Sequence, residues 1–123
     1  MIYYVSARNR IPQVIKQIDD FILAPDAPPV ANAGEDKTIQ LPTNSVTLDG
    51  SRSTDDVRVI TYDWKLVSGD RSVRLRDERR PVLTVDNLQE GVYVFELMVS
   101  DGKEQLDRDT VTVNVLKGIS SIW

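Results

Sequence analysis

The feature that most limits the fold is a series of short segments in which apolar and polar residues alternate, all of them after residue 34. They are Lys37–Leu41, Ser45–Leu48, Val59–Val67, Val82–Val85, Val92–Ser100 and Thr110–Leu116. Each is rich in β-branched or aromatic residues, and Gly, Asp, Asn or Pro separates it from the next. Such alternation is typical of strands with one buried face, and this spacing of turns is typical of an antiparallel sandwich. The sequence therefore predicts an all-β fold of about seven strands.

Two of these segments identify the core. In YDWKL, Trp64 lies in the middle of the segment and shares a face with Tyr62 and Leu66. A sandwich buries its largest side chain at such a position. In the segment that starts at Val92, the expected core face consists of Tyr93, Phe95, Leu97 and Val99.

The entry to this last segment has the form of a tyrosine corner. Leu88 and Gly91 precede Tyr93. In such a corner, the phenol of a tyrosine at the start of a strand bonds back to the preceding turn. We therefore expect the Tyr93 hydroxyl to bond the backbone a few residues upstream.

The first 34 residues differ in character from the alternating segments. Within the extension 1–24, apolar side chains recur at helical spacing over residues 11–23, so we expect either a short amphipathic helix or an unstructured tail. Residues 25–34 contain three prolines, which prevent regular hydrogen bonding, and are interpreted as a linker. The sandwich then covers residues 35–117, and residues 118–123 form a C-terminal tail.

Composition argues against several classes of function. The chain has no cysteine and no histidine, so it lacks the thiol nucleophile and the commonest general base, and we expect no enzymatic activity. Its formal charge of −4 is scattered, which argues against nucleic acid as a partner. The one basic cluster, RSVRLRDERR at residues 71–80, holds two acids and is interpreted as a solvated loop and strand face rather than a binding patch.

No apolar run reaches the ~18 residues of a membrane span, and the first residues lack the pattern of a signal peptide. We expect no membrane contact by the domain itself, and any export signal would lie outside this chain.

The stretch LDGSRSTDD, residues 48–56, concentrates acids and hydroxyls between two alternating segments. The plainer interpretation is a structural turn: Leu48 ends a strand, Asp49 and Gly50 turn the chain, and the hydroxyls that follow bond nearby backbone amides. Asp55 and Asp56 would then cap exposed N–H groups at the end of the loop. The alternative is that these acids bind a metal ion.

Five motifs follow one another along residues 28–116: VANAGEDKTIQL, LDGSRSTDD, YDW, EGVYVFELMVSDG and TVTVNV. Their order and spacing resemble those of a polycystic-kidney-disease (PKD) domain. The stretch TIQLPTNSVTLDGSRSTDD is most similar to the repeats of the dyslexia-associated membrane-protein family, which includes the adeno-associated-virus receptor. The resemblance implies an immunoglobulin-like β-sandwich at the cell surface, in a protein that carries several such domains in a row.

The resemblance also implies a calcium site. Some PKD domains of secreted bacterial enzymes bind calcium through the segment before the first strand and the aspartates of the serine-rich loop. The matching positions here are Asn32, Asp55 and Asp56, with Asp101 as a further carboxylate. These are oxygen ligands of the kind that calcium prefers. However, this chain lacks the Pro-Asp-Gly that follows the loop in many bacterial domains, and Asp101-Gly102 also fits a hairpin turn.

These observations predict a non-catalytic extracellular PKD module that serves as a spacer and as a protein-interaction or adhesion domain of a larger cell-surface protein. Its expected partners are other proteins or neighbouring PKD repeats, and calcium is the one candidate cofactor. The alternative is an accessory, calcium-binding module of a secreted bacterial hydrolase.

Overall fold

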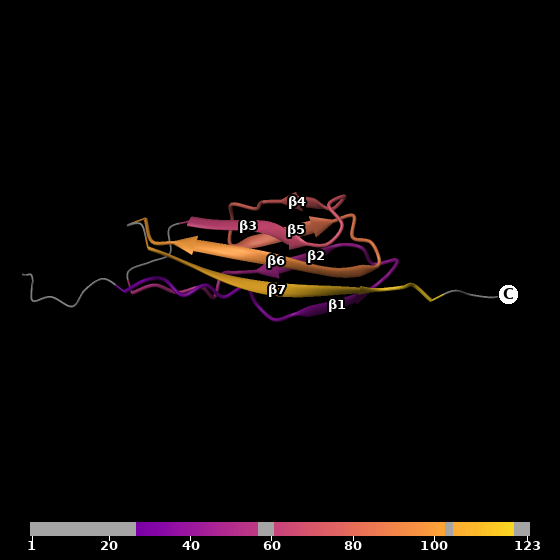
Figure 1. Ribbon diagram of the computed structural model, residues 1–123, viewed down its shortest axis with the longest axis horizontal. Coiled ribbons are helices and arrows are strands. Elements are labelled where there is room, and N and C mark those ends of the chain that lie inside the picture. Colours follow the sequence, from indigo (N-terminus) through magenta and orange to yellow (C-terminus); the bar gives the residue numbers. More distant parts are fainter. Residues whose placement is uncertain (1–26, 57–60, 103–104, 120–123) are drawn as a thin grey trace, which may run out of the picture.

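The structure is a computed structural model that describes residues 27–56, 61–102 and 105–119. Within these ranges, seven strands form two sheets (Figure 1). The four-stranded sheet has the order β1-β7-β6-β3, with β1 at Lys37–Gln40, β7 at Leu106–Leu116, β6 at Gly91–Ser100 and β3 at Thr61–Ser68. The three-stranded sheet has the order β2-β5-β4, with β2 at Val46–Asp49, β5 at Val82–Asp86 and β4 at Arg74–Arg76. The predicted all-β, immunoglobulin-like sandwich is confirmed.

Several expectations fall on parts of the chain that the structure does not describe. The helix or tail expected in residues 1–24 lies outside the described residues, as do residues 120–123 of the expected C-terminal tail. In the described ranges, no helix is long and apolar enough to cross a membrane.

All the strand pairs are antiparallel except one. Strands β6 and β7 form a long hairpin whose register runs from Gly91 opposite Val115 to Ser100 opposite Leu106. Strand β1 instead runs parallel to β7, with Lys37 opposite Val113. The sequence predicts an antiparallel sandwich, and this pair is the exception among the described strands. The parallel pair arises because the chain crosses to the other sheet after β1, so β1 pairs with the last strand and not with the next one.

The core is the apolar layer between the two sheets. Trp64 on β3 is 1% exposed, and its indole Nε1 donates a hydrogen bond to the Arg80 carbonyl oxygen at 3.2 Å. The buried residues of β6 are the expected Tyr93, Phe95, Leu97 and Val99. The other strands add Leu48, Leu83, Val85, Val111, Val113 and Val115. The core face predicted from the alternation is therefore confirmed.

The tyrosine corner is also confirmed. The Gln89 backbone N–H donates a hydrogen bond to Tyr93 Oη at 2.8 Å. The Tyr93 ring packs over Gly69, where a Cβ atom would come within 2.6 Å of Tyr93 Cδ2. Gly69 also has a φ of 126°, a conformation that favours glycine. The turn after β3 and the entry to β6 are thus fixed by one tyrosine.

Strand β7 is longer than predicted, and strand β4 was not among the predicted segments. Strand β7 begins at Leu106 rather than at Thr110, because the acidic residues before Thr110 pair in register with β6. Strand β4 lies inside the basic segment 71–80, where the sequence shows little apolar alternation. Only Leu75 of β4 packs against the core, and both neighbours of Leu75 are exposed.

We expect Trp64→Ala to lower the free energy of unfolding by about 3–5 kcal/mol, because it removes the largest buried side chain and leaves a cavity. Chemical denaturation measures this change. The matched control is Val92→Ala on β6, whose side chain is 57% exposed and whose loss should cost less than about 1 kcal/mol. Equal losses in the two variants would contradict the assignment of Trp64 to the core.

Candidate functional site

The candidate site is built around residues 29–36, which precede β1 and are called the N-terminal arm below. The backbone N–H groups of Ala31 and Ala33 donate hydrogen bonds to Oδ2 of Asp107 and of Asp109, both at 2.8 Å. The two alanine side chains are 9% and 1% exposed, respectively, and belong to the core. The arm therefore lies beside the first half of β7, held by side-chain carboxylates in place of strand carbonyls.

The arm includes much of the stretch that the sequence analysis interprets as a linker. Pro29 is buried, and the two alanines supply apolar side chains to the core. The packed part of the domain thus begins near residue 29, ahead of the expected start at residue 35. Proline prevents a regular ladder, but the aspartates of β7 satisfy the arm's backbone amides instead.

The acidic turn that follows β2 is held by its own backbone. Asp49 Oδ1 accepts a hydrogen bond from the Ser51 N–H at 2.9 Å, and the Ser53 N–H donates to the Gly50 carbonyl at 3.1 Å. Gly50 N–H donates to the Pro81 carbonyl at 2.8 Å. These are the local bonds expected of a structural turn.

The turn and the N-terminal arm are tied together by hydrogen bonds at two positions. Val30 and Thr54 exchange two backbone bonds, at 2.7 and 3.0 Å. The Asn32 N–H donates to Ser53 Oγ at 2.9 Å, and Ser53 is 8% exposed. The hydroxyl of this turn thus bonds a backbone amide, as predicted, although the amide belongs to the arm.

Two of the four residues proposed as calcium ligands also hold the backbone. Asn32 Oδ1 accepts a hydrogen bond from the Gly34 N–H at 2.9 Å. Asp56 Oδ2 accepts one from the Ala27 N–H at 3.0 Å, as expected of a residue that caps a free N–H group. One oxygen of each side chain is therefore already used by the fold.

The other two proposed ligands lie on different elements. Asp55 is half-buried at the end of the acidic turn, whereas Asp101 is 5% exposed and follows β6. The Asp101 N–H donates to the Gln105 carbonyl at 3.2 Å, so Asp101 opens the connection between β6 and β7. In the part of the chain that the structure describes, no three acidic side chains gather in a way that could hold a metal ion. Calcium binding stays a prediction, which a thermal melt in calcium and in chelator would decide.

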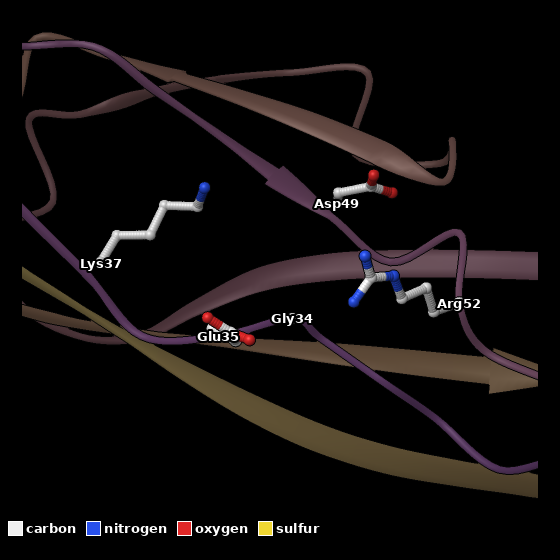
Figure 2. Close-up of a pocket in the computed structure, with 5 residues that line it drawn as sticks. All are labelled: Gly34, Glu35, Lys37, Asp49 and Arg52. Carbon is white, nitrogen blue, oxygen red and sulfur yellow. The ribbon is translucent and has the colours of Figure 1, made fainter.

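An open hollow of about 230 Å³ lies where the arm meets the acidic turn. Its lining residues are Gly34, Glu35, Lys37, Asp49 and Arg52 (Figure 2). Figure 2 shows the Arg52 guanidinium between the carboxylates of Asp49 and Glu35, with the Lys37 side chain on the opposite side of the hollow. Two acids and two bases make the hollow electrically balanced, and all four side chains are exposed.

The Asp49 carboxylate is not suited to acid catalysis. The Ser51 hydroxyl and the Ser51 N–H lower the pKa of Asp49 below its usual value, and the charges of Arg52 and Lys37 add to this effect. Asp49 is therefore ionised at neutral pH, whereas a general acid needs a raised pKa.

Two other acids are stabilised in their charged form. The Arg76 guanidinium, at 2.7 Å, and the Ser45 hydroxyl, at 2.8 Å, lower the pKa of Asp86. The backbone N–H and the hydroxyl of Ser72 lower the pKa of Asp70. Both acids hold turns or strand ends of the sandwich.

The acids that hold the arm are not among the site residues predicted from the sequence. Asp107 and Asp109 occupy the same face of β7 as Val111 and Val113, with half-buried side chains. Asp36 adds a third bond of this kind, since its Oδ1 accepts the Thr112 N–H at 2.9 Å. The available signal was the run LDRDTVTV, where acids continue the alternation of the buried face.

Comparison with known proteins places this sandwich in a family. The family model described as "K319L-like, PKD domain" matches residues 33–115. The chain belongs to this family. A PKD domain is a non-catalytic module, and the matched residues include β1 to β6 and all of β7 except Leu116.

The relatives that match are much longer than this chain. Low-density lipoprotein receptor-related protein 11 of Homo sapiens is 44% identical over 96 residues, which is 78% of this chain and 19% of that protein. The dyslexia-associated protein KIAA0319 of Homo sapiens is 44% identical over 94 residues, or 75% of this chain and 9% of that protein. The chain thus spans less than a fifth of the length of these relatives.

A solved structure agrees with the fold. The PKD domain from the KIAA 1837 protein has a TM-score of 0.72 and 37% sequence identity, and the match covers 81% of this chain and 98% of that domain. The predicted resemblance to a PKD domain of the dyslexia-associated family is therefore confirmed.

We expect Asp109→Ala to destabilise the domain by about 1–3 kcal/mol, because it leaves the buried Ala33 amide without its acceptor. Asp109→Asn should cost less, since the amide side chain keeps a carbonyl oxygen in the same place. Hydrogen exchange of the Ala33 N–H, followed by NMR, measures the effect locally. Equal exchange in the wild-type domain and in Asp109→Ala would contradict the role of this carboxylate.

Acid should weaken the bonds made by Asp86. Its pKa is lowered in the folded state, so its stabilising contribution is complete above the unfolded pKa of about 4 and is lost as the pH falls below that value. We therefore expect the melting temperature of Asp86→Asn to fall less steeply between pH 5 and pH 2 than that of the wild-type domain. Calorimetry at a series of pH values makes the comparison, and parallel curves would refute it.

Proposed function

We propose that the domain is an extracellular, non-catalytic PKD module that acts as a spacer and as a protein-interaction domain of a larger cell-surface protein. Membership of the family supports the module, and the short span relative to its relatives supports a larger parent protein. One relative is named as a receptor-related protein, which agrees with the cell-surface setting implied by the family resemblance.

The observation that carries the spacer role is the path of the chain. The first and the last described residues lie at opposite ends of the elongated sandwich (Figure 1). The chain enters along the N-terminal arm and leaves at Leu116, after crossing the length of the domain in β7. Copies joined in series would therefore add length rather than fold back.

The surface is suited to protein contacts. The sequence contains no Asn-x-Ser/Thr acceptor, so no N-linked glycan would cover the sheets. Lys65 and Arg108 both reach Glu96 on the outer face of the four-stranded sheet, at 3.3 and 3.8 Å. Such an exposed network contributes little stability, so these charges are available to select partners.

The alternative function, an accessory module of a secreted hydrolase, has less support. Polysaccharide binding requires flat aromatic rings on an exposed face. Among the described residues, Trp64, Tyr93 and Phe95 are all buried in the core. Tyr62 is half-buried and is left as the one candidate for stacking on a sugar ring within the described sandwich.

We expect two copies of the domain, with Leu116 of one joined directly to residue 28 of the next, to form an extended rod. Small-angle scattering should give a maximum dimension close to twice that of the single domain. A tandem protein with a flexible Gly/Ser linker of ~20 residues is the control, because such a linker lets the domains fold back on each other. Identical dimensions for the two tandem proteins would contradict the spacer role.

A further inference from the structure

A groove of about 530 Å³ opens on the side of the sandwich between β3 and β4. Its floor is apolar, formed by Leu66, Val73 and Leu75 above the buried Trp64. Pockets of about 300–1,000 Å³ with apolar floors are typical of binding sites. The groove is distinct from the hollow beside the N-terminal arm, with which it shares no lining residue.

Two strand edges border the groove. Within the described chain, β3 is the last strand of one sheet and β4 is the last strand of the other. The Trp64 N–H points away from β6, since it donates to the Glu78 carbonyl at 2.8 Å. Because backbone groups alternate along a strand, the Leu66 N–H and carbonyl point to the same open side. The segment around Glu78 thus covers the edge at Trp64, while the groove lies beside the edge at Leu66.

The irregularity in β3 after Leu66 limits how far another strand could pair along this edge. The register between β3 and β6 shifts between Leu66 and Ser68. A bulge of this kind bends the strand and ends regular pairing. Beside the groove, only a short part of the β3 edge is therefore open to pairing, which suits a short peptide in extended conformation.

The charged residues that line the groove are Lys65, Arg71 and Glu78, so its rim carries one more positive than negative charge. Segment 71–80 holds five arginines and two acids, in a chain whose formal charge is −4. Arg76, Arg79 and Arg80 each lie within 4.0 Å of a carboxylate. Arg71 lines the groove and has no ion pair in the described part of the chain, whereas Lys65 also lines the groove and lies 3.3 Å from Glu96 Oε1. These charges favour an acidic occupant.

We propose that this groove binds an extended acidic segment of a partner protein, which adds to the edge of β3 as an additional strand. The inference rests on the proposed role in protein interaction and specifies its surface and the chemistry of its partner. Backbone bonds to Leu66 would supply affinity, and alternate side chains would divide between the apolar floor and the cationic rim. A sulfated polysaccharide fits less well, because it has no apolar side chains to fill the floor.

The test is an NMR titration of the ¹⁵N-labelled domain with a capped eight-residue peptide in which valine and glutamate alternate. We expect saturable shifts of the amides of Leu66, Val73 and Leu75, and no saturable shifts with a peptide in which valine and lysine alternate. Arg71→Glu should weaken binding about five- to tenfold, because it reverses an unpaired charge on the rim. The matched control is Arg52→Glu, which makes the same change of charge outside the groove and should change the affinity less than twofold.

Three results would overturn the proposal. They are the absence of saturable shifts up to millimolar peptide, shifts centred on β1 and β7 instead of the groove, and an equal loss of affinity in Arg71→Glu and Arg52→Glu. A heparin oligosaccharide that shifts residues 71–80 when the peptide does not would assign the surface to sulfated sugar instead. The scattering measurement on the tandem protein does not involve the groove, so failure of the spacer role would be seen separately.

Discussion

The burial of Trp64 between the two sheets is the contact on which the rest of the structure depends. A Cβ atom on Gly50 would come within 3.0 Å of the Trp64 ring and 2.5 Å of Leu97 Cδ2, so the acidic turn lies directly over the core. Glycine at this position lets the turn approach, and Ser53 and Thr54 then bond the N-terminal arm. The position of the arm thus follows from how closely the turn packs on one tryptophan.

The arm also shows how a proline-rich segment joins a β-sandwich. Its amides are too irregular in position for a strand ladder, yet buried amides require acceptors. Asp107 and Asp109 supply carboxylate oxygens at the same alternate spacing as the core residues of β7. The parallel pairing of β1 with β7 is therefore preceded by a stretch in which side chains replace strand carbonyls as acceptors. This arrangement anchors the entry of the chain at one end of the module, as a domain within a series would require.

Much of the fold could be predicted from local pattern. Alternation identified the buried face of β6, the central position of Trp64 and the tyrosine corner at Tyr93, because each depends on residues close in sequence. Strand β4 was missed, since only Leu75 of its residues packs inward and arginines flank it. The packing of residues 29–34 could not be predicted either, because the acceptors for the amides of Ala31 and Ala33 lie 76 residues away. For the acidic turn, the structural interpretation agrees with the bonds of Asp49, Ser53 and Asp56, whereas calcium binding stays a prediction.

The sequence by itself determined the class of fold, the composition of the core and the family, since period-two alternation, turn residues and ordered motifs are all local properties. It also determined that cysteine and histidine chemistry is absent from this chain. Only the tertiary structure decided which strand edges remain open, which carboxylates bond the arm and where the groove between β3 and β4 lies. These features depend on which distant segments come together, and a carboxylate on an alternating strand looks the same in the sequence whether it meets water or a buried amide.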